Sequence, residues 1–156
     1  RAGRHRPGSG RATIRQRYVD ELERQFAADK HLLRHAAPEL VQAAELKLRG
    51  GVPDPAIFAR AAQGLRCQPG GEAIDTVVLA CTHFPLVQDE LGHAFGPQVQ
   101  FIDGAQGIAR RIAFLTHGQD FARQGSDFAV ITGDDPDPAS LLAAFRYFGL
   151  AEVRKL

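Results

Sequence analysis

The segment from Ala73 to Val87 constrains the fold of this chain more than any other part of the sequence. It opens with β-branched and apolar residues, and the run from Val77 to Ala80 predicts a strand buried on both faces. A Cys-Thr-His triplet then precedes Pro85 and an amphipathic stretch, so the expected order is strand, tight turn and helix. This order is typical of α/β proteins, in which the carboxyl ends of parallel strands line the ligand cleft.

Cys81 is expected at such a strand end. Thr82 is an N-cap candidate and Pro85 fits an early helical position, so backbone N–H groups and the positive end of a helix dipole should lie near the sulfur. Such surroundings lower the pKa of a thiol and can also hold a substrate carboxylate. His83 can lower that pKa further or donate a proton itself. The pattern therefore makes Cys81 and His83 candidate acid/base residues.

Two other interpretations of Cys81 stay open. A cysteine at a strand end is often a small buried hydrophobic residue. A Cys-x-His pair can also be half of a metal site, but no second pair with ligand spacing follows and Cys67 stands alone. The spacing therefore does not favour a metal ion.

The composition is typical of a soluble protein with one modest core. The 156 residues are 44% hydrophobic and 24% charged. Two widely spaced cysteines provide no disulfide framework, which favours a reducing compartment. No apolar run is long enough to cross a membrane, and no apolar signal segment follows the basic N-terminus. We therefore expect a cytoplasmic protein without a membrane partner.

Positive charge is concentrated at the start of the chain. Residues 1–17 carry six arginines and no acidic residue, although the whole chain has a net charge of only +1. Residues 1–11 are expected to form a disordered basic arm, because their Arg, Gly, Pro and Ser cannot bury enough apolar surface to offset the entropy of ordering. Such an arm can contact nucleic acid. An incorrectly translated end explains the composition better, so a nucleic-acid partner is not favoured.

The remaining sequence alternates helical and strand patterns. Helices are expected at 12–28 with Thr13 as cap, at 39–48, after the caps Asp54 and Asp103, along 86–95, and at 139–148 after Asp137. Strands are expected at 30–35, 77–80, 99–102, 128–132 and 153–156. This alternation predicts an α/β fold with a mainly parallel sheet.

The octapeptide Leu79-Ala80-Cys81-Thr82-His83-Phe84-Pro85-Leu86 resembles the second-cysteine motif of the glutamate racemases, within the aspartate/glutamate racemase superfamily. Phe-Ile-Asp-Gly at 101–104 and Thr-Gly-Asp at 132–134 also resemble family segments, so the resemblance covers about residues 13–156. It implies a two-lobed α/β fold and cofactor-free interconversion of L- and D-glutamate for peptidoglycan. In that family two cysteines act on opposite faces of the substrate.

The resemblance also assigns roles to individual residues. Cys81 matches the second catalytic cysteine, His83 the histidine that assists it, and Thr82 a residue that holds the substrate. Glu45, within Leu-Val-Gln-Ala-Ala-Glu, matches a glutamate that reaches the active-site cleft. Thr13 resembles a threonine near the substrate.

The family's first-lobe motifs, Asp-Ser and Cys-Asn-Thr, do not occur in this sequence. By analogy, residues 12–102 would form most of the second lobe, and residues 103–156 would return to an incomplete first lobe and expose apolar surface. We therefore expect a truncation or a frame change upstream of about residue 12. The expected racemase activity of this chain alone is very low or absent.

Two alternative functions remain. The chain could act on aspartate or a related amino acid, although Glu45 and the full Cys-Thr-His-Phe-Pro-Leu motif favour glutamate. It could instead be a non-enzymatic binding or sequestering protein. In the favoured interpretation the partner is a small molecule, no cofactor is needed, and a homo-oligomer is compatible with the sequence.

Overall fold

The computed structural model describes residues 9–122, 125–133 and 137–156, and the chain divides into two compact units between Arg34 and His35. The first unit contains α1 (Ser9–Phe26), which begins earlier than expected. Thr13 therefore lies inside the helix, so its expected role as N-cap is wrong. Residues 9–11 of the predicted disordered arm are helical, because Ser9 can open a helix and Arg11 and Ala12 favour its continuation. Residues 1–8 of that arm lie outside the described residues.

The strand expected at 30–35 does not form. Most of its side chains are exposed, and none of the described strands pairs with this segment. Arg34 instead forms ion pairs with two residues of α1, Asp20 at 2.6 Å and Glu23 at 2.7 Å. The prediction was wrong because an apolar pattern supplies β propensity but cannot supply the neighbouring strand that a sheet requires.

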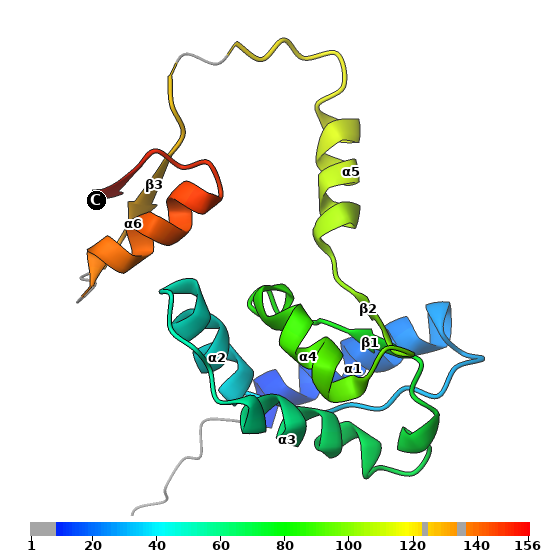
Figure 1. Ribbon diagram of the computed structural model, residues 1–156. Coiled ribbons are helices and arrows are strands. Elements are labelled where there is room, and N and C mark those ends of the chain that lie inside the picture. Colours follow the sequence, from blue (N-terminus) through cyan, green and yellow to red (C-terminus); the bar gives the residue numbers. More distant parts are fainter. Residues whose placement is uncertain (1–8, 123–124, 134–136) are drawn as a thin grey trace, which may run out of the picture. The chain divides into compact units, whose positions relative to one another are not determined.

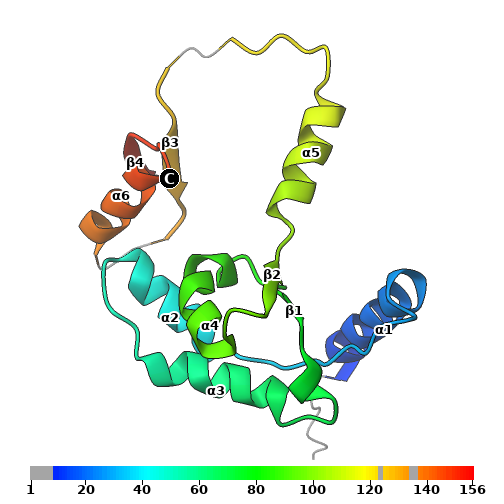
Figure 2. The ribbon, with the colours of Figure 1, turned by 45° about the vertical axis from the view of Figure 1, so that its right-hand side comes forward.

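The core of the second unit lies among three helices and one small sheet. The helices are α2 (Glu39–Leu48), α3 (Pro55–Arg66) and α4 (Gln88–Phe95), and the strands are β1 (Thr76–Val78) and β2 (Gln100–Ile102). Figure 1 and the rotated view of Figure 2 both show these helices gathered beside the two strands. The buried apolar residues that pack together are Ala37, Leu40, Ala43, Ala44, Phe58, Ala61, Ala62, Leu79, Val87, Leu91, Phe95 and Val99.

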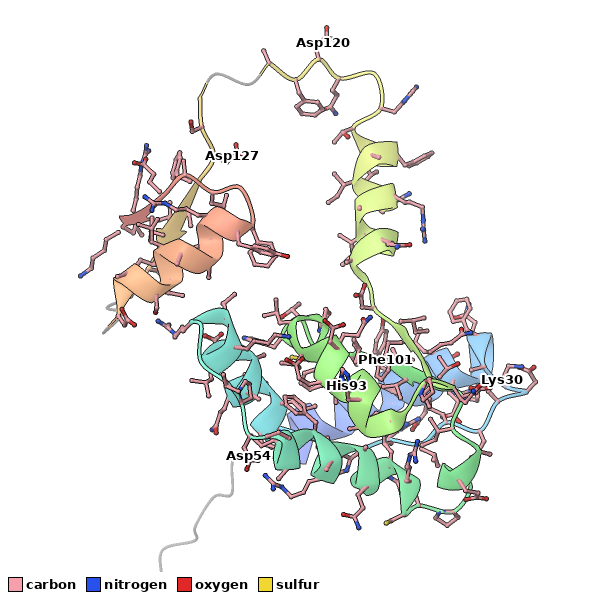
Figure 3. The ribbon with its side chains drawn as sticks, viewed as in Figure 1. Lys30, Asp54, His93, Phe101, Asp120 and Asp127 are labelled. Atoms are coloured by element: carbon pink, nitrogen blue, oxygen red, sulfur yellow. The ribbon has the colours of Figure 1, made fainter. Side chains whose placement is uncertain are left out.

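Local signals set the ends of these helices as the sequence predicts. Asp54, labelled in Figure 3, accepts a hydrogen bond at Oδ1 from the backbone N–H of Ala56 (2.9 Å) and so caps α3. Gly50 adopts a φ of 82° after α2, and its N–H donates to the carbonyl of Lys47. Gly96 ends α4 with a φ of 86°. Between α3 and β1 lies a short 3₁₀ helix, η1 (Gly71–Ala73).

β1 and β2 pair in parallel, with Val77 opposite Phe101. Phe101, labelled in Figure 3, packs edge to face against Phe95 of α4, and the two ring centroids are 5.8 Å apart. However, Val78 is 57% exposed and Ile102 is 51% exposed. The expectation that this strand is buried on both faces is therefore wrong, because two-sided burial needs a covering layer on each face of the sheet.

The C-terminal part contains α5 (Ala105–Leu115), β3 (Phe128–Ile131), α6 (Pro138–Tyr147) and β4 (Glu152–Lys155). β3 and β4 pair in parallel and are joined through α6. Asp137 Oδ1 accepts a hydrogen bond from the N–H of Ser140 (3.3 Å), which confirms the expected cap. Asp134, in the turn expected before α6, lies outside the described residues. These elements confirm the α/β class with parallel strand pairs.

Apolar side chains of the C-terminal part remain exposed to solvent. α5 buries none of its residues, and its apolar side chains Ile108, Ile112, Phe114 and Leu115 are 56–70% exposed. This confirms the expectation of exposed apolar surface after residue 103. β3 was expected to be buried, but Phe128 and Val130 are also largely exposed, because β3 pairs with β4 alone. The predicted lobe boundary at residues 102–103 stays a prediction.

None of the helices in the described part of the chain is long and apolar enough to cross a membrane.

Candidate active site

Cys81 lies at the carboxyl end of β1, beside an open hollow of about 460 Å³. The side chain is only half-buried, so the sulfur is not packed inside the core. The hollow lies where β1 and β2 end, as expected for a parallel sheet. It is lined by Leu79, Ala80, Cys81, Thr82 and Pro85, and by Asp103, Gly104, Ala105 and Ile108 at the start of α5. This position makes Cys81 available to a ligand.

The turn after Cys81 differs from the expected helix start. A 3₁₀ helix, η2 (Phe84–Val87), comes first, and α4 begins only at Gln88. His83 occupies the N-cap position of η2, no side chain caps it, and Thr82 is therefore not the cap that the sequence predicted. Pro85 does lie in the first turn, as expected. The sulfur therefore faces local backbone N–H groups and not the end of an α-helix dipole.

The thiol of Cys81 lies in surroundings that favour its thiolate form. Hydrogen bonding from the backbone N–H of His83 lowers the pKa of Cys81 most, and the His83 side chain lowers it further. Burial opposes this shift, while the backbone N–H of Phe84 adds to it. The net pKa of Cys81 is lower than that of an ordinary thiol, which increases the share of nucleophilic and basic thiolate at neutral pH.

His83 joins Cys81 to Glu45. Its Nδ1 lies 3.7 Å from Cys81 Sγ, and its Nε2 lies 3.0 Å from Glu45 Oε1. Because an ionised carboxylate only accepts hydrogen bonds, Nε2 must carry the proton that is donated to Glu45. Nδ1 is then left to accept a proton from the thiol, or to donate one to the thiolate once the ring is charged. Glu45 thereby fixes the ring in the tautomer that proton exchange with Cys81 requires.

The same contacts favour the charged form of His83. The hydrogen bond with Cys81 raises the pKa of His83 most, the hydrogen bond with Glu45 raises it further, and burial opposes both. The two shifts act in concert, since a lowered thiol pKa and a raised imidazole pKa both favour a thiolate–imidazolium pair. Such a pair can remove a proton from a bound ligand at sulfur and return one from the same atom.

The structure brings four of the five candidate residues together, namely Cys81, Thr82, His83 and Glu45. Glu45, 38 residues before His83 in sequence, contacts the imidazole and does not line the hollow. Thr82 is exposed and lines the hollow beside Cys81. Thr13 lies in α1, and its side chain is outside the described residues.

Sequence reasoning missed part of the wall of the hollow. Asp103 was interpreted only as a helix cap, and its Oδ1 does accept a hydrogen bond from the N–H of Ala105 (2.8 Å). The same residue also lines the hollow, together with Cys81 and Thr82. The available signal was its position directly after β2, because neighbouring parallel strands end at the same edge of a sheet.

A metal site has no geometric support in the described residues, where no group of three or more His, Cys, Asp and Glu side chains is placed to hold an ion. Cys67 is exposed at the end of α3 and does not line the hollow.

The chain is similar in sequence to several bacterial glutamate racemases. It is 53% identical to the enzyme of Sphingopyxis alaskensis over 143 residues. This alignment covers 91% of this chain and 53% of that relative. It is 33% identical to the enzyme of Yersinia pseudotuberculosis serotype IB over 151 residues. This alignment covers 94% of this chain and 51% of that relative. The chain belongs to the glutamate racemase family.

Solved glutamate racemases share the fold. The crystal structure of the Escherichia coli enzyme in complex with L-glutamate and the activator UDP-MurNAc-Ala matches with a TM-score of 0.80 and 30% identity, over 94% of this chain and 55% of that chain. The RacE1 isoform from Bacillus anthracis matches with a TM-score of 0.66 and 21% identity, over 92% of this chain and 53% of that chain. No protein-family model matches the chain. The chain thus spans about half the length of the glutamate racemases it matches.

Proposed function

We propose that Cys81 is one of the two acid/base groups of a cofactor-independent glutamate racemase. The whole protein would interconvert L- and D-glutamate in the cytoplasm and supply D-glutamate for peptidoglycan. The observation that carries this proposal is the contact of Cys81 with His83, and of His83 with Glu45, beside an accessible hollow. Family membership supports the reaction, and the surroundings of the sulfur support its mechanism.

In this mechanism the Cys81 thiolate removes the α-proton of glutamate and becomes a thiol. The electron pair of the broken C–H bond stays on the α-carbon until an acid on the opposite face returns a proton there. In the reverse direction the Cys81 thiol supplies the proton. His83 holds the sulfur in its reactive form, and Glu45 acts on the sulfur through His83. Glu45 is therefore proposed as a positioning residue.

Substrate binding would involve Thr82, which lines the hollow, while a contact from Thr13 stays a prediction. Cys67 does not line the hollow and is not proposed as the second acid/base group. Since Cys81 is the only thiol among the described residues that line the hollow, we expect far less racemisation from the chain alone than from a full-length racemase. Circular dichroism of D-glutamate solutions incubated with the purified chain measures this directly.

The thiol itself can be tested without racemase turnover. In a Cys67→Ser background, we expect iodoacetamide to alkylate Cys81 faster at pH 7 than it alkylates Cys67 in a Cys81→Ser variant, because the surroundings of Cys81 stabilise its thiolate. Millimolar L-glutamate should slow alkylation of Cys81 and leave that of Cys67 unchanged. L-aspartate at the same concentration tests the alternative substrate. Equal rates at the two thiols, with no protection by glutamate, would reject the proposed function.

A further inference from the structure

A second ionic contact joins the same two segments that carry Glu45 and His83. Lys47 Nζ of α2 lies 2.7 Å from Oε1 and 2.8 Å from Oε2 of Glu90 in the first turn of α4. The two side chains are 35% and 30% exposed, so solvent screens this ion pair only in part. The lysine thus bridges both oxygens of one carboxylate, which fixes the separation of the two helices at this point.

The contact lies in the last turn of α2, where none of the apolar side chains is fully buried. The fully buried residues of α2 are Leu40, Ala43 and Ala44, and all of them precede Glu45. None of the residues from Glu45 to Leu48 is buried. Polar contacts therefore add to the partial burial of Leu48 in holding the last turn of this helix in position.

The other partner is continuous in sequence with the candidate active site. α4 follows η2 directly, and His83 precedes η2 at its N-cap position. The segment from His83 to Glu90 is thus tied twice to the last turn of α2, through Glu45 at one point and Lys47 at the other.

We propose that Lys47 and Glu90 form a positioning pair for the candidate active site: they hold the last turn of α2 so that Glu45 stays within hydrogen-bonding distance of His83. This inference rests on the proposed function of Cys81 and His83. Neither Lys47 nor Glu90 touches the hollow beside Cys81, so their effect reaches the sulfur only through Glu45 and His83.

The charged groups near the two contacts come from several of the described elements, and Asp89 of α4 lines a hollow together with Lys47. Glu90 faces Lys47 from α2 and interacts with His93 of its own helix, which is labelled in Figure 3. His83 faces Glu45 from α2 and Cys81 from its own turn. Asp103 lines the hollow from the start of α5. A change at Lys47 or Glu90 is therefore read most directly in the titration of Cys81 and His83.

The test uses Lys47→Met and Glu90→Gln, each in the Cys67→Ser background, with Cys81 alkylation followed from pH 5 to 10. We expect each variant to react with iodoacetamide roughly two- to fivefold more slowly at pH 7, which is the size of coupling typical within one polar network. The His83 imidazole should titrate at lower pH by NMR. The exchanged pair Lys47→Glu with Glu90→Lys should restore the alkylation rate.

The matched control is Arg24→Met, which removes a cation from an ion pair with Glu21 on α1 and should leave alkylation unchanged. Circular dichroism checks that each variant is folded, and Lys47→Gln, which also removes the cation, replaces Lys47→Met if the latter is not. An unchanged alkylation profile in folded Lys47→Met and Glu90→Gln would overturn the positioning role. The proposed function fails separately, if Cys81 of the unaltered chain is no more reactive than Cys67.

Discussion

His83 Nε2 lies 3.0 Å from Glu45 Oε1, and this contact links α2 to the turn that carries Cys81. Glu45→Gln keeps the shape of the side chain but removes its negative charge, so the pKa of His83 should fall and the thiolate of Cys81 should lose part of its stabilisation. We expect slower alkylation of Cys81 at pH 7 and an imidazole that titrates at lower pH by NMR. Glu39→Gln, at the start of the same helix, is the matched control.

The sign of the His83 effect also sets a pH dependence. Because the pKa of His83 is raised in the folded chain, its interactions stabilise the fold fully at pH values below the unfolded pKa and are lost as pH rises through the folded pKa. Glu45→Gln should therefore cost stability mainly at acidic and neutral pH. An equal cost at pH 9 would contradict the Glu45–His83 interaction as its source.

Val87 connects the candidate site to the core, since it ends η2 and is fully buried. Val87→Ala removes two methyl groups from a packed interior and should reduce the free energy of unfolding by about 2 kcal/mol. Urea denaturation measures this loss. Val52→Ala makes the same chemical change at a side chain that is 89% exposed, and it should cost less than about 0.5 kcal/mol. Similar losses at both positions would argue against the described core.

Gly64 of α3 lies beneath the imidazole ring of His35, and a β-carbon at Gly64 would overlap that ring. In a His35→Ala background, Gly64→Ala should stabilise the chain by about 1 kcal/mol, because alanine has a higher propensity than glycine for the interior of a helix. With His35 present, the gain should be smaller or reversed. A thermodynamic cycle of the four proteins in urea measures the coupling, and simple additivity would contradict the contact.

Glu90 supplies a pH test of its contact with Lys47. Burial raises the pKa of Glu90, but the hydrogen bond from Lys47 and further contacts hold the net pKa below its ordinary value. The stabilisation is therefore present above the unfolded pKa and is lost as pH falls through the folded pKa. We expect the free energy of unfolding of the unaltered chain to exceed that of the Glu90→Gln variant by about 0.2–1 kcal/mol at pH 7. This difference should disappear on acidification from about pH 5 downward.

Features that depend on neighbouring residues could be predicted from the sequence. Asp54 caps α3 and Gly96 ends α4 because the side chain or the φ preference of one residue decides each outcome. The strand after Ala73 and the cysteine at its end were also predicted, since an apolar run followed by a turn is a local pattern. These signals were enough to select Cys81 and His83.

Features that depend on distant partners could not be predicted in this way. The segment 30–35 has strand composition, but none of the strands in the described residues pairs with it, and Val78 is apolar but 57% exposed. The contact between Glu45 and His83 spans 38 residues, so no periodicity within either segment encodes it. Resemblance to the family selected Glu45, but only the structure shows that its carboxylate meets the imidazole.

The exposed apolar side chains of α5 are expected to limit the solubility of this polypeptide. Ile112 and Phe114 offer water a surface that it wets poorly, so the protein will adhere to phenyl resins and self-associate as its concentration rises. Working at micromolar concentration, or introducing Ile112→Lys, should reduce this self-association. The exposed apolar face of α5, whose first residues line the hollow beside Cys81, thus limits the protein concentration at which every assay can be run.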